Sequence, residues 1–158
     1  MPSGTQLNQV ITRVEGLTPT SEPTVTFRCE DDAAGGTPPL EELAQGGAGA
    51  FRIFDIRTVT GPMDDGQATV ANLRFHQDFA LRVAYPWGGN PNSERMKRIA
   101  NDDTEAIIQD LRNPNNWGAV GIDGLNIGLP DQKPTDTEIG GPSGPAFLRV
   151  IPFRLRFT

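Results

Sequence analysis

The residues that most often perform chemistry in proteins are few in this sequence, and none stands in a catalytic pattern. There is one histidine, His76, whereas zinc sites and general-base sites usually depend on histidine. It falls at a polar position of a predicted strand, which favours a solvated imidazole. The one cysteine, Cys29, has no partner for an internal disulfide and fits a small apolar residue on a strand.

The acidic clusters and the glycine-rich runs are typical of turns. Glu30-Asp31-Asp32 and Asp64-Asp65-Gly66 bring carboxylates together, but neither has the spacing of a calcium loop. The run at 140–144, GGPSG, lacks the spacing of a nucleophile elbow. No phosphate-binding loop or dinucleotide fingerprint occurs among the 18 glycines. The sequence therefore predicts a protein that is not an enzyme, with no catalytic residue, no metal site and no cofactor.

Composition favours one β-rich domain over residues 1–158. Only 36% of the 158 residues are hydrophobic, while glycine contributes 18 and proline 14, which is typical of a modest core with long loops. The formal charge of −6 disfavours a dedicated nucleic-acid binder, which needs basic residues to neutralise phosphates. No basic region followed by an apolar run opens the chain, and no apolar run approaches the ~20 residues of a membrane span. We expect neither a signal peptide nor a membrane contact.

The segment 69–85 predicts one long strand around which the chain is arranged. Its odd positions are mostly apolar and its even positions mostly polar, so one face should lie on a core and the other, with Arg74 and Arg82, should face outward. A bend or bulge is expected near His76-Gln77-Asp78 because the strand is so long.

Two segments have the spacing of amphipathic helices. The first covers 5–17, and the second covers 93–112, with Ser93 as N-cap and Asn113-Pro114 as its end. Asp103 lies on the apolar stripe of the second helix. Either the helix kinks at Asn101-Asp102, or Asp103 meets a polar partner.

The remaining segments complete an α+β fold, a mainly antiparallel sheet flanked by one or two helices, with long loops. Segment 51–60 should pair with the long strand as a hairpin, and 117–129 should form a bent, edge-type strand. Pro152 argues for an edge position or a bulge in the closing strand. The long loops are 31–50 and 130–145, which we expect to be mobile until neighbouring subunits order them. The other predicted strands are 24–30 and 146–158.

This order of elements resembles the tail terminator proteins of long-tailed bacteriophages. The likeness covers the C-terminal part of the chain, and its motifs are loose patterns. Loops 31–50 and 130–145 are longer than the family pattern requires. The residues that carry the likeness are Leu81–Tyr85 (LRVAY), Arg95–Asp102 (RMKRIAND), Ile107, Ile108, Leu111, the loop ending at Trp117, and Phe153–Phe157 (FRLRF).

The resemblance implies a structural protein at the head-proximal end of the virion tail, assembled in the host cytoplasm. Such proteins form a homo-hexameric ring that caps the tail tube protein, ends tail elongation and joins the head-side connector or stopper protein. DNA would pass through the lumen without specific binding. Two alternatives remain open: a neck or head-completion adaptor of the same virion, and a small cytosolic ligand-binding module.

The residues proposed for subunit or partner contacts are outward arginines and acidic turns. Arginine-bearing strand faces could pair with carboxylates of a neighbour, although ordinary solvated strand faces explain them equally well. The candidate interface residues are Arg74, Arg82, Arg154, Arg156, Asp64 and Asp65.

Overall fold

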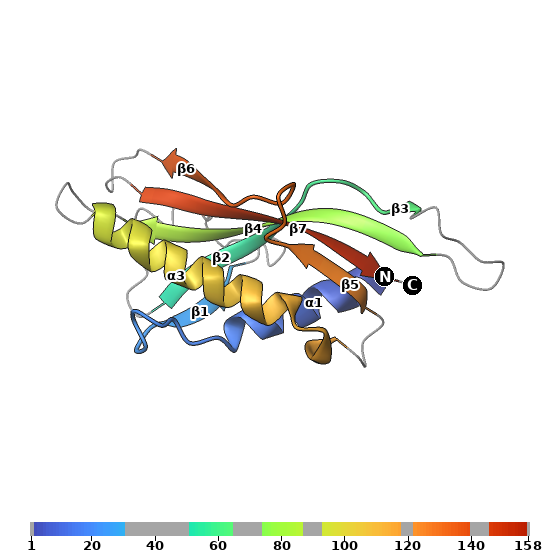
Figure 1. Ribbon diagram of the computed structural model, residues 1–158, viewed down its shortest axis with the longest axis horizontal. Coiled ribbons are helices and arrows are strands. Elements are labelled where there is room, and N and C mark those ends of the chain that lie inside the picture. The colour runs from blue at the N-terminus through green and yellow to red at the C-terminus, as the bar shows by residue number, and fades with distance from the viewer. Residues whose placement is uncertain are drawn as a thin grey trace.

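A seven-stranded mixed sheet with two helices on one face forms the protein (Figure 1). The computed structural model describes residues 2–30, 51–64, 74–86, 93–117, 122–139 and 146–157. The strand order is β1-β2-β4-β7-β5, with β3 beside β4 and β6 beside β7. All pairings are antiparallel except that of β1 with β2. The predicted α+β class is confirmed. The strands are β1 (Thr26–Cys29), β2 (Phe51–Thr58), β3 (Met63–Asp64), β4 (Phe75–Pro86), β5 (Ile122–Ile127), β6 (Thr135–Ile139) and β7 (Ala146–Phe157).

The two longest strands, β4 and β7, are the centre of the sheet. They pair without a register shift from Phe75 opposite Phe157 to Pro86 opposite Ala146. The predicted alternation of β4 is confirmed, because Phe79, Leu81, Val83 and Tyr85 are buried on the helix-bearing face. Aromatic rings meet across this pair, with ring centroids 5.2 to 6.0 Å apart, and such pairs stabilise a sheet beyond their buried area. The pairs are Phe75–Phe157, Phe79–Phe153 and Tyr85–Phe147.

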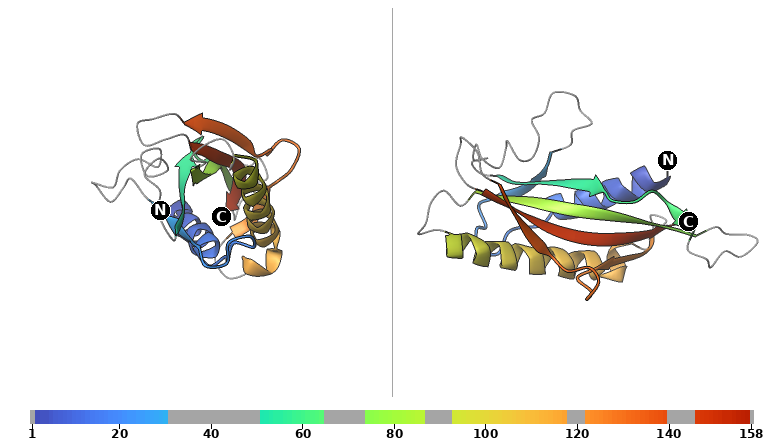
Figure 2. Two further views of the ribbon diagram at one scale, coloured as in Figure 1. Left: turned by 90° about the vertical axis from the view of Figure 1, so that its left-hand side faces the viewer. Right: turned by 90° about the horizontal axis from the view of Figure 1, so that it is seen from above.

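The helices α1 (Pro2–Glu15) and α3 (Ser93–Arg112) lie side by side under the sheet (Figures 1 and 2). α3 has the predicted bounds, with Glu94 in its first turn and Arg112 in its last, as the helix dipole favours. After it, Pro114–Asn116 form a 3₁₀ turn, and the indole nitrogen of Trp117 donates to the carbonyl of Leu111 at 2.9 Å. The helices bury Val10, Val14, Ile99, Ala100, Ile107 and Leu111 against the sheet.

The strand pairing differs from the sequence prediction in two places: β4 has no bulge at the expected position, and Pro152 lies neither at an edge nor at a bulge. The β4–β7 register runs through His76, Gln77 and Asp78 without a bulge. Pro152 lies in a central strand, because β7 has β4 on one side and both β6 and β5 on the other. β6 pairs with β7 only as far as Val150, and β5 pairs only from Phe153. Pro152 therefore occupies the gap between them, where its missing N–H costs no ladder bond.

The segment 130–145 is not all loop. Thr135–Ile139 form β6, which pairs with the first half of β7. Its alternation was hidden because almost every residue of this strand is exposed, so no apolar face marks it in the sequence. β5 is bent as predicted, with a register shift between Ile122 and Gly124. The predicted loop 31–50 lies outside the described residues.

Candidate functional site

The sheet face opposite the helices carries a row of paired charges. Arg82, on β4, donates to both carboxylate oxygens of Asp55 on β2, at 2.9 and 2.5 Å. Arg57 donates to the same carboxylate at 3.0 Å. The side chains of Arg82 and Asp55 are only 16% and 9% exposed. The predicted outward arginine is therefore confirmed in position, but its carboxylate partner belongs to its own chain.

A second pair on this face has the same geometry. Arg154, on β7, donates to both oxygens of Asp78 on β4, at 2.7 and 3.1 Å. The hydrogen bonds from Arg154 hold the pKa of Asp78 below its usual value, because they favour the charged carboxylate. Sequence analysis missed Asp55 and Asp78 as partners. Both residues occupy outward-facing positions of the two strands that were predicted to pair, and these positions could have identified them as candidates.

The other candidate interface residues are spread over one end of the sheet. Arg156 lies two residues after Arg154 on β7, in register with His76. Arg74 is exposed and directly precedes β4. Asp64 is exposed in the short strand β3, in register with Phe75, and Asp65 lies outside the described residues. The structure thus brings Arg82, Arg154 and Arg156 to one face, with Arg74 and Asp64 near its end.

The same face becomes apolar where β4 ends and β7 begins. Ile53, Ala84, Ala146 and Leu148 form a second buried cluster, with Ile139 of β6 packed against it. The outer face, which the sequence predicts to be mostly polar, is therefore apolar at this end of the sheet. The run Leu148, Val150 and Pro152 on the outward parity of β7 was the sequence signal for it.

Beneath α3, a buried polar group answers the question posed by Asp103. α3 continues through Asp103. The Oδ2 atom of Asp103 accepts a 2.8 Å hydrogen bond from the Tyr85 hydroxyl and a 3.1 Å hydrogen bond from Arg52. The Arg52 guanidinium lies 4.8 Å above the centre of the Tyr85 ring and also donates to Glu22. Burial raises the pKa of Asp103 even though Tyr85 and Arg52 oppose the shift. Asp103 therefore meets polar partners, as one of the two alternatives required.

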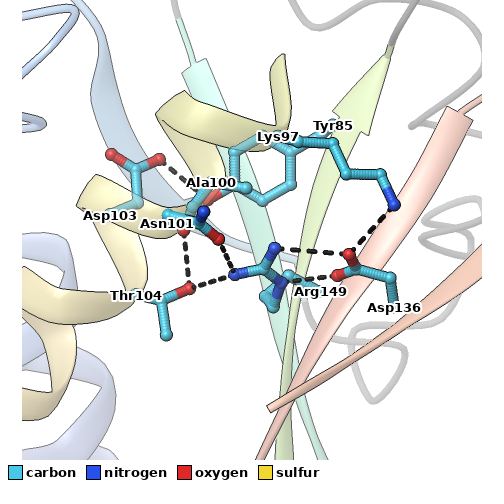
Figure 3. A network of polar contacts seen from close by, with 8 residues as sticks. All are labelled: Tyr85, Lys97, Ala100, Asn101, Asp103, Thr104, Asp136 and Arg149. Carbon is cyan, nitrogen blue, oxygen red and sulfur yellow. Dashed lines mark hydrogen bonds and ion pairs between the residues drawn. The ribbon is translucent and has the colours of Figure 1, made fainter. Parts of the chain in front are cut away.

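Arg149 fastens β6 and α3 to the sheet (Figure 3). Although its parity on β7 is that of the core, it is only 7% exposed and donates to Asn101 and Thr104 of α3, at 3.0 and 3.1 Å. It also donates to both carboxylate oxygens of Asp136 on β6, at 2.5 and 3.3 Å. Partial burial of Asp136 is outweighed by these bonds, which hold its pKa below the usual value. Lys97 adds a further contact to Asp136 at 3.3 Å.

A cavity of about 490 Å³ opens between α3 and β6, next to this network. The charged groups in its wall have partners within the chain, since Arg149 donates to Asp136 and Gln109 donates to Glu105 at 3.0 Å. Ile108 and Pro134 complete the wall. The arrangement stabilises the contact between helix and strand.

Neither a cluster of metal-ligand side chains nor a membrane-spanning helix occurs in the part of the chain that the structure describes. Within those residues no group of three or more histidine, cysteine, aspartate or glutamate side chains could hold a metal ion. None of the described helices is long and apolar enough to cross a bilayer. The polar pairs described above join strands to one another and to α3.

Comparison with known proteins gives a likeness of fold. No protein-family model matches the sequence, and no curated protein matches it either. Among solved structures, the chain is similar to a chain of the "Virion of native gene transfer agent (GTA) particle", with a TM-score of 0.60 and 13% sequence identity. The match covers 98% of this chain and 96% of that chain. The two chains share one fold from end to end.

Proposed function

We propose that the protein is a structural component of a phage-like virion. The observation that carries this proposal is the end-to-end match of fold with a chain of a gene transfer agent virion. The match covers 98% of this chain and 96% of that chain. The polar groups described above, which bind one another instead of surrounding a reactive centre, agree with a role in assembly rather than in turnover.

Within the virion, we assign the protein to the tail terminator. Six copies would form a ring at the head-proximal end of the tail, bind the last ring of tail tube protein, and present the joint to the head-side connector. The resemblance of Leu81–Tyr85, Arg95–Asp102 and Phe153–Phe157 to that family supports the assignment. In the structure these segments are the end of β4, the first half of α3 and the end of β7. The formal charge of −6 would help a lumen pass DNA without capture.

The test is deletion of the gene in the phage or particle-producing strain, with a plasmid copy of the unchanged gene as the control. Electron microscopy of the lysates should show tails of uncontrolled length that are not joined to filled heads, and the plasmid copy should restore normal particles. Tails of normal length beside heads that leak DNA would instead support the neck-adaptor alternative. Particles of unchanged form and number would contradict both virion roles and favour the ligand-binding module.

A further inference from the structure

Among the described residues, the outer edge of β2 is covered along only half of its length. Among the described strands, β1 alone pairs with this edge, and it does so at Phe51–Phe54. The backbone N–H of Glu30 donates to the carbonyl of Phe54 at 2.8 Å, so the backbone groups of Phe54 point outward. Because backbone direction alternates along a strand, Ile56 and Thr58 also point their N–H and C=O groups away from the sheet.

A groove runs along this open edge. It has a volume of about 380 Å³ and lies between β2 and α1. Leu7 and Ile11 of α1 and Ile56 of β2 give it half-buried apolar walls. An open strand edge beside an apolar wall is the arrangement that accepts an added strand, because the backbone groups supply hydrogen bonds and the wall supplies side-chain contacts.

The opposite side of the sheet ends in a strand with a matching open edge. The carbonyl of Asp78 accepts from Val59 at 2.9 Å, so even residues of β4 point toward β2 and odd residues point toward β7. Through the β4–β7 and β6–β7 registers, Thr137 points toward β7, while Asp136 and Glu138 point outward. Among the described strands, β6 pairs only with β7.

The most exposed charges on the two edges have opposite sign, although Asp136 of β6 is already bound by Arg149 and Lys97. The side chains of Arg28 on β1 and Arg57 on β2 are 55% and 45% exposed, and each also binds a carboxylate of its own chain. β6 has two carboxylates, Asp136 and Glu138, and no basic residue. An exposed guanidinium has donors on several sides and can face a second carboxylate while it keeps its first.

We propose that neighbouring copies of this chain join edge to edge, with β6 of one copy pairing along Asp55–Thr58 of the next. This inference rests on the proposed ring and names the contact that closes it. β6 and the open part of β2 lie on opposite sides of one sheet, so the contact is heterologous, as a closed ring requires. The contact between subunits then does not need Arg82 and Arg154, which bind carboxylates of their own chain.

Proline substitutions test the contact without touching the sheet of the single subunit. Thr58→Pro and Glu138→Pro each remove an outward N–H at an exposed residue, so the ladders of β2 with β4 and of β6 with β7 stay intact. Thr58→Ala and Glu138→Ala keep the N–H and are the matched controls. Native mass spectrometry and particle counts should show at least a tenfold loss of assembled rings for the proline variants only, at unchanged melting temperature.

Cross-linking locates the contact directly. Thr58 and Glu138 are in register with Phe79 and Phe147, so both lie on the helix-bearing face and would meet on one side of a continuous sheet. In a Cys29→Ala background, the double variant Thr58→Cys/Glu138→Cys treated with a short bismaleimide should give a covalent ladder up to six copies. A mixture of the two single variants should give dimers, and each single variant alone should stay monomeric.

The outcomes separate the edge contact from the proposed function. Normal particles whose double-cysteine subunits remain monomeric after cross-linking would overturn the edge contact alone. Cross-links to a virion protein of a different mass would also overturn it, because the strand would then come from another partner. Proline variants that lose assembled rings in native mass spectrometry yet still make tails of normal length would instead contradict the tail-terminator role.

Discussion

Replacement of Asp103 by alanine should strongly destabilise the protein. The change removes the carboxylate that accepts from Arg52 at 3.1 Å and from Tyr85 at 2.8 Å. Arg52 is 6% exposed at its side chain, so its guanidinium would remain in the interior with Glu22 as its remaining carboxylate partner. Breaking a buried ion pair by removing one partner costs about 3–5 kcal/mol, a large part of the about 5–15 kcal/mol that a native domain has.

Urea unfolding followed by circular dichroism measures this loss. With a slope of about 2 kcal/mol per molar urea, the midpoint should fall by about 1.5–2.5 M. Asp102→Ala is the matched control, because Asp102 is the preceding residue of the same helix and is exposed, with Ser21 as its partner. The control should shift the free energy of unfolding by less than about 1 kcal/mol.

A double variant checks the reasoning. Arg52→Met/Asp103→Leu removes both charges together, and apolar replacements of a buried pair are often neutral or stabilising. It should therefore recover most of the stability lost in Asp103→Ala. A double variant that is destabilised by the sum of the two single changes would refute the argument, as would an unchanged midpoint for Asp103→Ala.

Two further predictions follow from local geometry. Gly128→Ala should lower the free energy of unfolding, measured by a thermal melt, by more than about 1 kcal/mol. Gly128 has φ of +69°, and an added Cβ would meet Ile108 at 2.8 Å. Gly124→Ala is the control in the same thermal melt, because Gly124 has open space around it. The lowered pKa of Asp78 means that its contribution to stability is complete above the unfolded pKa of about 3.9 and is lost as pH falls through the lower folded pKa. The difference in melting temperature between the unchanged protein and Asp78→Asn should therefore shrink below about pH 4, and a constant difference from pH 2 to 7 would contradict the assignment of Arg154 as its cause.

The elements that the sequence predicted well are those with one apolar face. β4 and α3 have strong periodicity because they bury large apolar residues such as Leu81 and Ile107 on one side. β6 could not be found in the same way, because its residues are exposed on both sides. The parity of Arg149 looked like a fault in the closing strand, since its partners Asn101, Thr104 and Asp136 are distant in sequence.

The candidate interface was predictable in its positions and not in its pairings. Period-two alternation placed Arg82 and Arg154 on the outward face, which the structure confirms. Which carboxylate each arginine binds depends on the register between strands, and this register cannot be read from the sequence of one strand alone. The open edge of β2 depends on where β1 stops, and that boundary is set by tertiary contacts rather than by local preference.

The central position of β7 sets the order in which this protein can fold during synthesis. β5 and β6 pair, among the described strands, with β7 alone, and β4 has β7 along one entire side. Until residues 146–157 have left the ribosome, β5 and β6 have no ladder and the nascent sheet is missing its middle. Folding must then bring together segments far apart in sequence, which slows the transition. The β6 edge that would join subunits therefore exists only after β7 is in place, so a nascent chain cannot present both edges to an assembly before its sheet is complete.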